Sequence, residues 1–381
     1  MTSARPGRPG QGADGRRDSG LRSSPDDSPA PDISVVMPVL DGLDLLPHSV
    51  GALEASELAP DRWELVVVDD GSRDGTPDWV RDRGHRVLSV VDGPRGPGHA
   101  RNRGSEVARG RILMFVDVDV CVHDTALERT LGVFGEHPDV GAVFGAYDDR
   151  PSDTGFLSQY RNLYHRWVHL RGAGAAETFW AGCGAVRADL FRELGGFDDE
   201  RFPRPQIEDI ELGYRIRDAG WKILLDPGIQ GTHMKRWTLG GMLRTDLLDR
   251  GVPWMRLLLA APRTGSLNVS TGERVRTALV GLAGVMVLVA ALTADLRWLG
   301  AAILALLVNI ASNMAVYRWL VDRRGVGFAL RSVPINVLYY AVSGVAAILG
   351  VMLHWTTGRT WGTARSRGSL RTAAASEPDS T

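Results

Sequence analysis

The 381-residue chain has no surplus of charge of either sign and very little cysteine. Its 44 lysines and arginines are matched by 45 aspartates and glutamates, so no excess of cations is available to neutralise the phosphates of a nucleic acid. We therefore expect no nucleic-acid partner. The two cysteines, Cys121 and Cys183, cannot build a disulfide framework, and no spacing with histidines predicts a structural zinc site.

Residues 1–31 have almost no large apolar side chains and are rich in proline, glycine, serine, arginine and aspartate. A segment of this composition cannot offset its ordering entropy by burial, so we expect a disordered amino-terminal tail. No apolar run follows Arg16 and Arg17, so the sequence predicts no signal peptide there. We expect the segment that follows to start in the cytoplasm.

Short β-branched runs alternate with helix-compatible stretches between Ile33 and Tyr147. The runs are ISVVMPV (33–39), WELVVVD (63–69), RVLSVV (86–91), RILMFVD (111–117) and GAVFGAY (141–147). Continuous apolar runs bounded by turn residues are typical of strands that are buried on both faces of a parallel sheet. The pattern predicts an open α/β sheet whose ligands bind at the carboxyl ends of the strands.

The carboxyl-terminal part of the chain has the composition of a membrane protein. Three stretches at 277–294, 298–317 and 332–353 contain no charged residue, and each approaches the ~20 residues that cross a hydrocarbon core. They predict a membrane domain over 276–355 with about three transmembrane helices, followed by a disordered tail over 356–381. Segment 238–275 mixes leucine and tryptophan with arginine, which favours an amphipathic interfacial element over a surface helix of the soluble domain.

The distribution of arginines predicts the orientation only in part. Arginines within 263–276 and 318–324 fall on one side of the predicted spans, which places the amino-terminal domain of a multi-pass cell-membrane protein in the cytoplasm. Three spans would put the tail outside, although it carries four arginines between residues 359 and 371. Either the third stretch does not fully cross the membrane, or the tail departs from the rule.

Carboxylates follow two of the predicted strands. Asp69 and Asp70 stand in VVVDDGSRDGT (66–76), where a carboxylate can accept a hydrogen bond from a nucleobase or simply close an Asp-Gly turn. Asp117 and Asp119 stand two apart in VDVDV (116–120), so they share one face of a regular strand. Both can approach one hard cation, Mg²⁺ or Mn²⁺, or serve as solvated strand caps.

Three further segments carry polar groups that can have either a functional or a purely structural role. GPRGPGHARNRG (93–104) can present backbone N–H groups and Arg101 to a diphosphate, or form a loop with surface arginines. Glu208 and Asp209, at a predicted helix start, can supply a general base or only favour the helix dipole. In HMKRW (233–237), His233 can bind a metal, and a lone surface histidine is the alternative.

In this order, the segments resemble the family 2 glycosyltransferases of the GT-A fold. The resemblance rests on ISVVMPV, VVVDDGSRDGT, GPGHARNRG, FVDVDV, WAGCGAVRADLFRELGGFDDE, IEDIELGYR and HMKRW, and it covers about 33–237. It implies a GT-A domain over 32–237, built on an open and mostly parallel sheet that binds a nucleotide-diphospho-sugar.

The resemblance also implies a role for individual residues. Pro38 and Asp70 would line the nucleotide pocket, Asp70 would address the base, and Arg101 would lie near the diphosphate. Asp117 and Asp119 match the family's DXD element and would hold Mg²⁺ or Mn²⁺ on the donor phosphates, with His233 as a further ligand. Asp209 matches the catalytic base, with Glu208 as its neighbour. The acceptor side would be formed by Gly182, Cys183, Gly184, Arg236 and Trp237.

The implied reaction is an inverting transfer of a sugar from a UDP- or GDP-sugar to a membrane-associated acceptor, a polyprenyl phosphate or a glycolipid. The first alternative is that the enzyme is anchored in the membrane but transfers the sugar to a soluble acceptor. A processive polysaccharide synthase is a second one, although His233 stands where processive members have glutamine. A catalytically inactive nucleotide-sugar-binding scaffold and a nucleotidyltransferase complete the alternatives, and the latter lacks a lysine-rich phosphate motif near the first strand.

Overall fold

The computed structural model describes residues 29–263 and 270–357, and all but residues 29 and 30 belong to one unit that begins at Pro31. Most of the two tails expected at 1–31 and 356–381 lies outside the described residues. The same holds for residues 264–269 of the expected interfacial segment 238–275.

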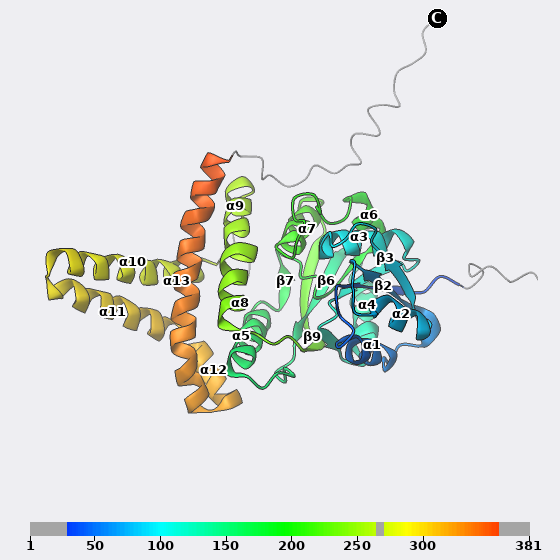
Figure 1. The fold of residues 1–381 in the computed structure, drawn as a ribbon, viewed down its shortest axis with the longest axis horizontal. Coiled ribbons are helices and arrows are strands. Elements are labelled where there is room, and N and C mark those ends of the chain that lie inside the picture. The colour runs from blue at the N-terminus through cyan, green and yellow to red at the C-terminus, as the bar shows by residue number, and fades with distance from the viewer. Residues whose placement is uncertain (1–28, 264–269, 358–381) are drawn as a thin grey trace, which may run out of the picture. The chain divides into compact units, whose positions relative to one another are not determined.

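A nine-stranded sheet organises residues 33–233 (Figure 1). The strand order is β3-β2-β1-β4-β8-β6-β9-β5, and β7 also pairs with β9. The strands are β1 (Ile33–Val39), β2 (Trp63–Asp69), β3 (Arg86–Ser89), β4 (Ile112–Val116), β5 (Val120–Val122), β6 (Val140–Tyr147), β7 (Gly174–Ala176), β8 (Cys183–Arg187) and β9 (Lys222–His233). All five predicted strands form, as β1, β2, β3, β4 and β6.

The first four strands of this order are parallel, so their carboxyl ends meet at one edge of the sheet. β8 runs antiparallel to β4 and β6, whereas β6 and β9 are again parallel. All seven side chains of β1 are buried, because helices cover both faces of the sheet. The predicted α/β architecture is thereby confirmed.

Seven helices accompany the sheet. They are α1 (Leu46–Glu54), α2 (Thr76–Asp82), α3 (Pro97–Val107), α4 (Ala126–Glu136), α5 (Phe156–Arg171), α6 (Ala188–Glu193) and α7 (Glu208–Asp218). One core lies under α1 and α4, and a second lies under α3, α6 and α7. α3 approaches the sheet so closely that a Cβ at Gly104 would lie 2.4 Å from Val36 Cγ1, which only glycine permits.

The chain then turns into helices that pack beside α5. α8 (Leu239–Arg244), a π-helical turn (Thr245–Gly251) and α9 (Val252–Ala260) continue one another, and we call them the 239–260 helix. α10 (Thr271–Thr293) and α11 (Leu296–Ser312) form an antiparallel pair, and α12 (Met314–Arg324) and α13 (Val326–Thr356) follow. Figure 1 shows α9 beside α13, while the α10–α11 pair leads away from them.

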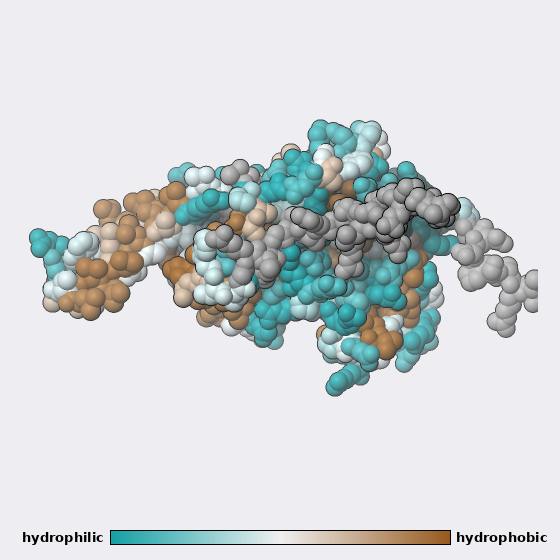
Figure 2. Space-filling view, turned by 90° about the horizontal axis from the view of Figure 1, so that it is seen from above, coloured by the Kyte–Doolittle hydropathy of each residue, from teal (hydrophilic) through white to brown (hydrophobic). Residues whose placement is uncertain are grey.

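Two of these helices, α10 and α13, are long and apolar enough to cross a membrane. The second predicted stretch, 298–317, is interrupted at Asn313, where α11 and α12 are bent by 58°. Counting that bent pair as one span gives three. Figure 2 shows apolar side chains gathered on the α10–α11 pair, where the exposed residues include Leu282, Val285, Leu288, Leu292, Leu304 and Leu307.

Candidate active site

Strand pairing brings two distant motifs of the sequence together. β5 follows the DXD element and pairs antiparallel with the end of β9, so that Val120 lies opposite His233. As a result, His233 Nε2 lies 3.6 Å from Asp119 Oδ2, and Met234 N donates to the Asp119 carbonyl over 2.8 Å. The ring of His233 stacks on Tyr147 with centroids 4.2 Å apart, which fixes the plane of the imidazole.

The charge of Asp119 follows from the same neighbours. Burial raises its pKa, but the contact with His233 and the charge of Lys235 outweigh burial and hold the pKa below its usual value. Asp119 is therefore ionised at neutral pH. An anionic oxygen beside an imidazole at a strand end is a donor pair that a divalent cation accepts.

Arg101 joins the DXD element to the acidic pair of α7. Its Nη2 donates to Asp117 Oδ1 over 2.6 Å, and its Nη1 donates to Glu208 Oε1 over 3.1 Å. The Arg101 side chain is 5% exposed and that of Glu208 is 6% exposed, whereas the Asp117 side chain is 35% exposed. Both terminal nitrogens of Arg101 thus contact protein carboxylates, and Asp117 keeps an accessible face.

Asp209 lies in the first turn of α7, half-buried beside Glu208. Its Oδ2 accepts a hydrogen bond from the backbone N–H of Ala181 over 3.2 Å. Burial raises the pKa of Asp209 to about 6 and the charge of Glu208 adds to the rise, while Arg101 and Arg250 oppose it. A carboxylate with this pKa exchanges a proton near neutral pH, as a general base must.

The glycines of the WAGCG segment allow the backbone to pass close to Trp180. A Cβ on Gly182 would lie 2.6 Å from the Trp180 ring, and one on Gly184 would lie 2.3 Å from the Trp180 carbonyl oxygen. The carbonyl of Gly182 accepts from the N–H of Asp117 over 3.1 Å, so this segment borders the DXD element. Cys183 is fully buried and burial raises its pKa to about 12, so it stays a thiol at neutral pH.

Asp70 holds the loop before α3. Its Oδ1 accepts from the N–H of Arg95 over 2.8 Å, and its Oδ2 accepts from the N–H of Gly96 over 2.7 Å. Gly96 has a φ of +93°, and a Cβ there would lie 2.5 Å from the Pro203 carbonyl oxygen, so the position requires glycine. Pro38 lies buried in β1 opposite Val68. Contacts of Asp70 and Pro38 with a nucleotide remain predictions.

The last two residues of HMKRW differ in their surroundings. Arg236 is exposed. The Trp237 backbone N–H donates to Ser158 Oγ over 2.8 Å, and its ring centroid lies 5.3 Å from the Arg161 guanidinium and 4.6 Å from the Lys235 ammonium. Trp237 therefore anchors the start of the 239–260 helix to α5, and its predicted part in acceptor binding is untested.

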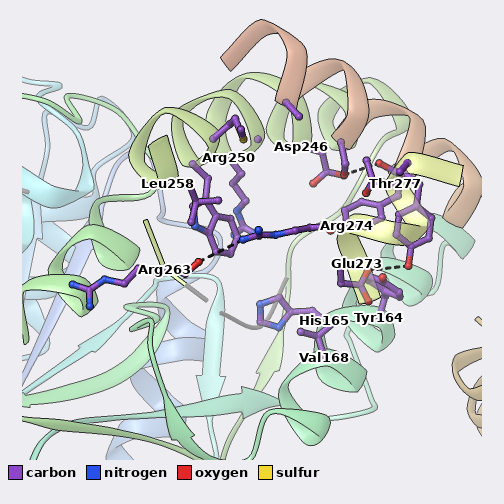
Figure 3. Close-up of a pocket in the computed structure, with 18 of the residues that line it drawn as sticks. Tyr164, His165, Val168, Asp246, Arg250, Leu258, Arg263, Glu273, Arg274 and Thr277 are labelled. Carbon is purple, nitrogen blue, oxygen red and sulfur yellow. Dashed lines mark hydrogen bonds between the residues drawn. The ribbon is translucent and has the colours of Figure 1, made fainter. Parts of the chain in front are cut away.

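A cavity of about 590 Å³ lies between α5, the 239–260 helix, α10 and α13 (Figure 3). His165 and Arg250 line this cavity and Trp180 lies beside it, and none of the three was expected as a site residue. His165 lines the cavity, and its ring lies 5.1 Å from that of Trp180. Burial and nearby cations lower the pKa of His165 well below its usual value, so it is neutral. The i, i+4 spacing of His165 and His169 was the signal available in the sequence.

The described residues contain no group of three or more histidine, cysteine or acidic side chains placed to hold a metal ion. Asp119 and His233 supply two ligands, and Asp117 lies nearby in contact with Arg101. Two protein ligands are enough where donor phosphates complete the coordination, as is usual for Mg²⁺ with nucleotides. The residues therefore fit a divalent ion that arrives with the donor.

Comparison with known proteins decides the family. The family described as Glycosyl transferase family 2 matches residues 34–195. Residues 34–195 therefore form a family 2 glycosyltransferase domain. This confirms the predicted enzyme class, and the sheet with its helices is accordingly of the GT-A type.

The relatives of this glycosyltransferase are distant. "Glycosyltransferase AglE" of Haloferax volcanii is 25% identical over 241 residues, which cover 58% of this chain and 77% of that protein. Validoxylamine A glucosyltransferase of Streptomyces hygroscopicus subsp. limoneus is 27% identical over 243 residues, covering 51% of this chain and 49% of its own length. The chain thus spans about half the length of that relative. A PGL/p-HBAD biosynthesis glycosyltransferase of Mycobacterium tuberculosis is 32% identical over 155 residues, which cover 37% of this chain and 60% of that protein.

Two solved structures are similar over most of the glycosyltransferase chain. The mannosyltransferase PcManGT from Pyrobaculum calidifontis, in complex with GDP-Man and Mn²⁺, aligns with a TM-score of 0.47 at 18% identity and covers 88% of this chain and 90% of its own. S. aureus TarS 1–349 in complex with UDP-GlcNAc aligns with a TM-score of 0.46 at 16% identity and covers 82% and 90%.

Proposed function

We propose that the protein transfers one sugar from a nucleoside-diphosphate donor to a lipid acceptor at the membrane surface, with inversion at the anomeric carbon. The observation that supports this most directly is the convergence of four motifs at one edge of the sheet. Asp119 meets His233 there, and Arg101 links Asp117 to the acidic pair of α7. Motifs separated by more than 100 residues thus form one polar site.

On the donor side, Asp119 and His233, with Asp117, would hold a divalent ion. When bound, that ion supplies positive charge against the departing diphosphate. Arg101 donates hydrogen bonds to both Asp117 and Glu208, and it thereby fixes the position of the Asp117 carboxylate. Asp70 fixes the loop 93–96, whose backbone borders α3, and so shapes the side of the site on which the nucleotide would lie.

On the acceptor side, Asp209 would take the proton from the attacking hydroxyl. The acceptor oxygen forms a bond to the anomeric carbon while the bond from that carbon to the diphosphate oxygen breaks. The nucleoside diphosphate leaves with the bonding electrons, and the proton stays on Asp209 Oδ. A pKa of about 6 allows Asp209 to be ionised at neutral pH and still accept a proton. A phosphate as the acceptor would need no base, and Asp209 would then only orient it.

The acceptor class follows from the helices that pack on the domain. α13 packs against the 239–260 helix and α10 packs against α13, and both helices are long and apolar enough for a bilayer, so the site would be held near the membrane. A processive synthase would need spans enough to enclose a polymer, and the described residues contain at most three. An inactive scaffold would have no reason to keep Asp209 at a pKa near 6, because an unused buried carboxylate only destabilises the fold.

The experiment uses membranes that contain the full chain, a lipid extract, Mn²⁺ or Mg²⁺ and a panel of radiolabelled UDP- and GDP-sugars. We expect label from one donor to enter the organic phase, and Asp119→Ala and Asp209→Asn to abolish the transfer. Asp78→Asn, an exposed residue of α2, is the matched control and should transfer like the wild type. Label in polymeric or water-soluble product would refute the lipid acceptor, and donor binding without any transfer would support the scaffold.

A further inference from the structure

The 590 Å³ cavity combines an apolar wall with a cluster of arginines. Leu258 of the 239–260 helix lines it on one side, and Val168 of α5 lies opposite (Figure 3). Trp254 and Leu259 of the same helix also line it. Its volume is in the range of sites that enclose a small ligand. The cavity borders α10 and α13, the two helices apolar enough to cross a membrane, so a lipid can reach it from the bilayer.

The charges that line the cavity are not balanced. Four arginines and two acidic residues lie in its wall, namely Arg161, Arg250, Arg263, Arg274, Asp246 and Glu273. Asp246 is bound by Arg161 over 2.5 Å, Glu273 accepts from Tyr340, and Arg263 pairs with Asp218 outside the lining.

Arg250 differs from the other cations of the wall. Among the residues that the structure describes, it makes no hydrogen bond or ion pair, although it is half-buried. A half-buried guanidinium without a counter-ion is unfavourable, and an anion from outside the chain would supply the missing partner.

Arg250 also interacts electrostatically with the proposed catalytic carboxylate, Asp209. Its charge acts on Asp209, and it acts on His165 and His169 in the wall of the cavity. Trp180 connects this wall to the site, since its ring contacts His165 and its neighbour Ala181 donates to Asp209. A group bound by Arg250 would therefore lie next to the group that Asp209 deprotonates.

We propose that the cavity holds a lipid acceptor with a phosphate between its apolar chain and its accepting hydroxyl, and that Arg250 binds this phosphate. This rests on the proposed function and narrows its acceptor class. The phosphate neutralises Arg250, the first part of the chain lies against Leu258 and Leu259, and the hydroxyl reaches Asp209 beyond Trp180. A neutral glycolipid would leave Arg250 unpaired, and a lipid phosphate without a hydroxyl would leave Asp209 without a proton to remove.

The test measures lipid retention by native mass spectrometry on the full chain in detergent. The probes are phosphatidylinositol, phosphatidic acid and a neutral galactosyl diacylglycerol. We expect the two phospholipids to be retained at least tenfold better than the neutral lipid. Arg250→Gln should remove that preference and Arg250→Lys should restore it, while Arg244→Gln, an exposed arginine of α8, should keep it. Ala347→Trp, which fills the cavity from α13, should reduce retention of all three.

Equal retention of charged and neutral lipids, or a preference that survives Arg250→Gln, would overturn the proposal. Competition by inorganic phosphate at the same concentration as the lipids would also overturn it, because the site would then bind a free anion. Calorimetric measurement of UDP and GDP binding in the presence of Mn²⁺ distinguishes failure of the proposed function from failure of the acceptor site alone. If neither binds, the proposed function itself fails. If one binds while the lipids show no preference, only the acceptor site fails.

A second inference concerns which helices enter the bilayer. The 239–260 helix lies along the glycosyltransferase domain over its whole length. Asp246 pairs with Arg161 of α5 near one end, and Leu257 is buried against the Phe202 cluster near the other. Trp254 Nε1 donates to Tyr214 OH of α7 over 3.3 Å in between. This helix therefore stays on the same side of the membrane as the domain.

α13 runs beside the 239–260 helix in the same direction. A Cβ on Gly251 would lie 2.6 Å from Ala346 Cβ, and one on Gly350 would lie 2.6 Å from Met255 Cβ, so the two helices touch at their backbones. At the start of α13, the Phe328 ring lies 5.1 Å from that of Phe156 in α5. Both halves of α13 thus contact elements on the domain side, which is incompatible with a helix that crosses to the other side.

The α10–α11 pair has the features of a membrane hairpin. At its base, Arg276 Nη2 donates to the Ser312 carbonyl over 2.8 Å, and at its tip Asp295 and Arg297 form an ion pair at 2.8 Å. The charge-free residues 277–294 between base and tip rise about 27 Å at the usual helical rise, which matches a hydrocarbon core. Small residues of α10 and α11, including Ala283, Ala302 and Ala305, let the helices pack closely.

We infer that, among the described helices, α10 and α11 cross the bilayer, and that α13 and the 239–260 helix lie on its surface. The chain then returns to the domain side after α11. A tail that follows on that side would agree with the positive-inside rule, because the sequence has four arginines between residues 359 and 371. Of the two possibilities that the sequence left open, the third apolar stretch does not cross.

Site-directed labelling tests this arrangement in sealed vesicles of both orientations. In a Cys121→Ser background, single cysteines are placed as Glu136→Cys on the domain, Arg297→Cys at the hairpin tip and Ser366→Cys in the tail. We expect a membrane-impermeant maleimide to label positions 136 and 366 from one side and position 297 from the other. Labelling of 366 together with 297 would show that α13 crosses, and labelling of all three from one side would show that the hairpin does not.

Discussion

Replacing Asp209 by asparagine should stop sugar transfer and stabilise the folded protein at alkaline pH. Burial and the charge of Glu208 raise the pKa of Asp209 from 3.8 to about 6. A rise of this size corresponds to about 3 kcal/mol by which the ionised carboxylate destabilises the fold. Asparagine has nearly the same shape and keeps an oxygen for the Ala181 N–H, so the substitution removes mainly the charge.

The sign of the pH dependence follows from the direction of the shift. Because the pKa is higher in the folded state, folding binds a proton between about pH 4 and 6, and stability falls as pH rises through this range. Above pH 6 the full penalty is present, and below pH 4 it is absent. Asp209→Asn should therefore raise the melting temperature at pH 8 by several degrees, and the gain should shrink steadily towards pH 4.

The assay is thermal unfolding of the detergent-solubilised full chain, followed by tryptophan fluorescence at pH 8, 6 and 4.5. Asp78→Asn is the control, because its carboxylate is exposed on α2 and should leave the melting temperature unchanged. A lower melting temperature of Asp209→Asn at pH 8, or the same gain at all three pH values, would show that the ionised Asp209 does not destabilise the fold.

The remaining predictions concern the same site. The pH profile of kcat/KM should fall on the acid side near pH 6. Glu208→Gln should move this acid limb to lower pH, because it removes the repelling charge that helps to raise the Asp209 pKa. An acid limb at the same pH in the variant would contradict this. Arg101→Met should lower the free energy of unfolding by about 3–5 kcal/mol in denaturant titration, since Glu208 would remain buried without its partner; Arg103→Met, an exposed position of α3, should change it little. Gly182→Ala should reduce activity more than nucleotide binding, because its Cβ would press on Trp180; equal losses would contradict that separation.

The sequence predicted the elements that follow simple patterns. β1, β2 and β4 are continuous apolar runs bounded by turn residues, and such runs form strands wherever both faces of a sheet are covered. The position of the carboxylates at the ends of β2 and β4 follows directly from these runs, because parallel strands end at one edge.

The rest depends on pairing between distant segments. β5 has only three residues, and β9 contains Pro227 and Gly228, so neither shows a strand pattern by itself. Their pairing is nevertheless what brings His233 to Asp119. Periodicity within a segment carries no information on such a contact, and only the family resemblance indicated that the two motifs belong to one site.

The sequence could not predict the polar contacts at the centre of the site or the packing of the helices, because both depend on residues that are distant in the chain. Arg101 was expected near a diphosphate. Its two carboxylate partners are Asp117, directly after β4, and Glu208 of α7, which is 107 residues away in the chain. α13 satisfies length and hydropathy rules for a span, but those rules do not consider tertiary contacts. Gly251 and Gly350, which bring it against the 239–260 helix, look like ordinary helix glycines in the sequence.

Whether Asp209 is the base of a lipid-directed sugar transfer can be measured as the transfer of radiolabel from a nucleotide sugar into extractable lipid, compared between the wild type and Asp209→Asn. We expect time-dependent labelling of a lipid by the wild-type membranes, and a loss of at least about a hundredfold in the variant while binding of the nucleoside diphosphate is kept. Equal lipid labelling by the two proteins would contradict the assignment of Asp209 as the base and, with it, this account of the site.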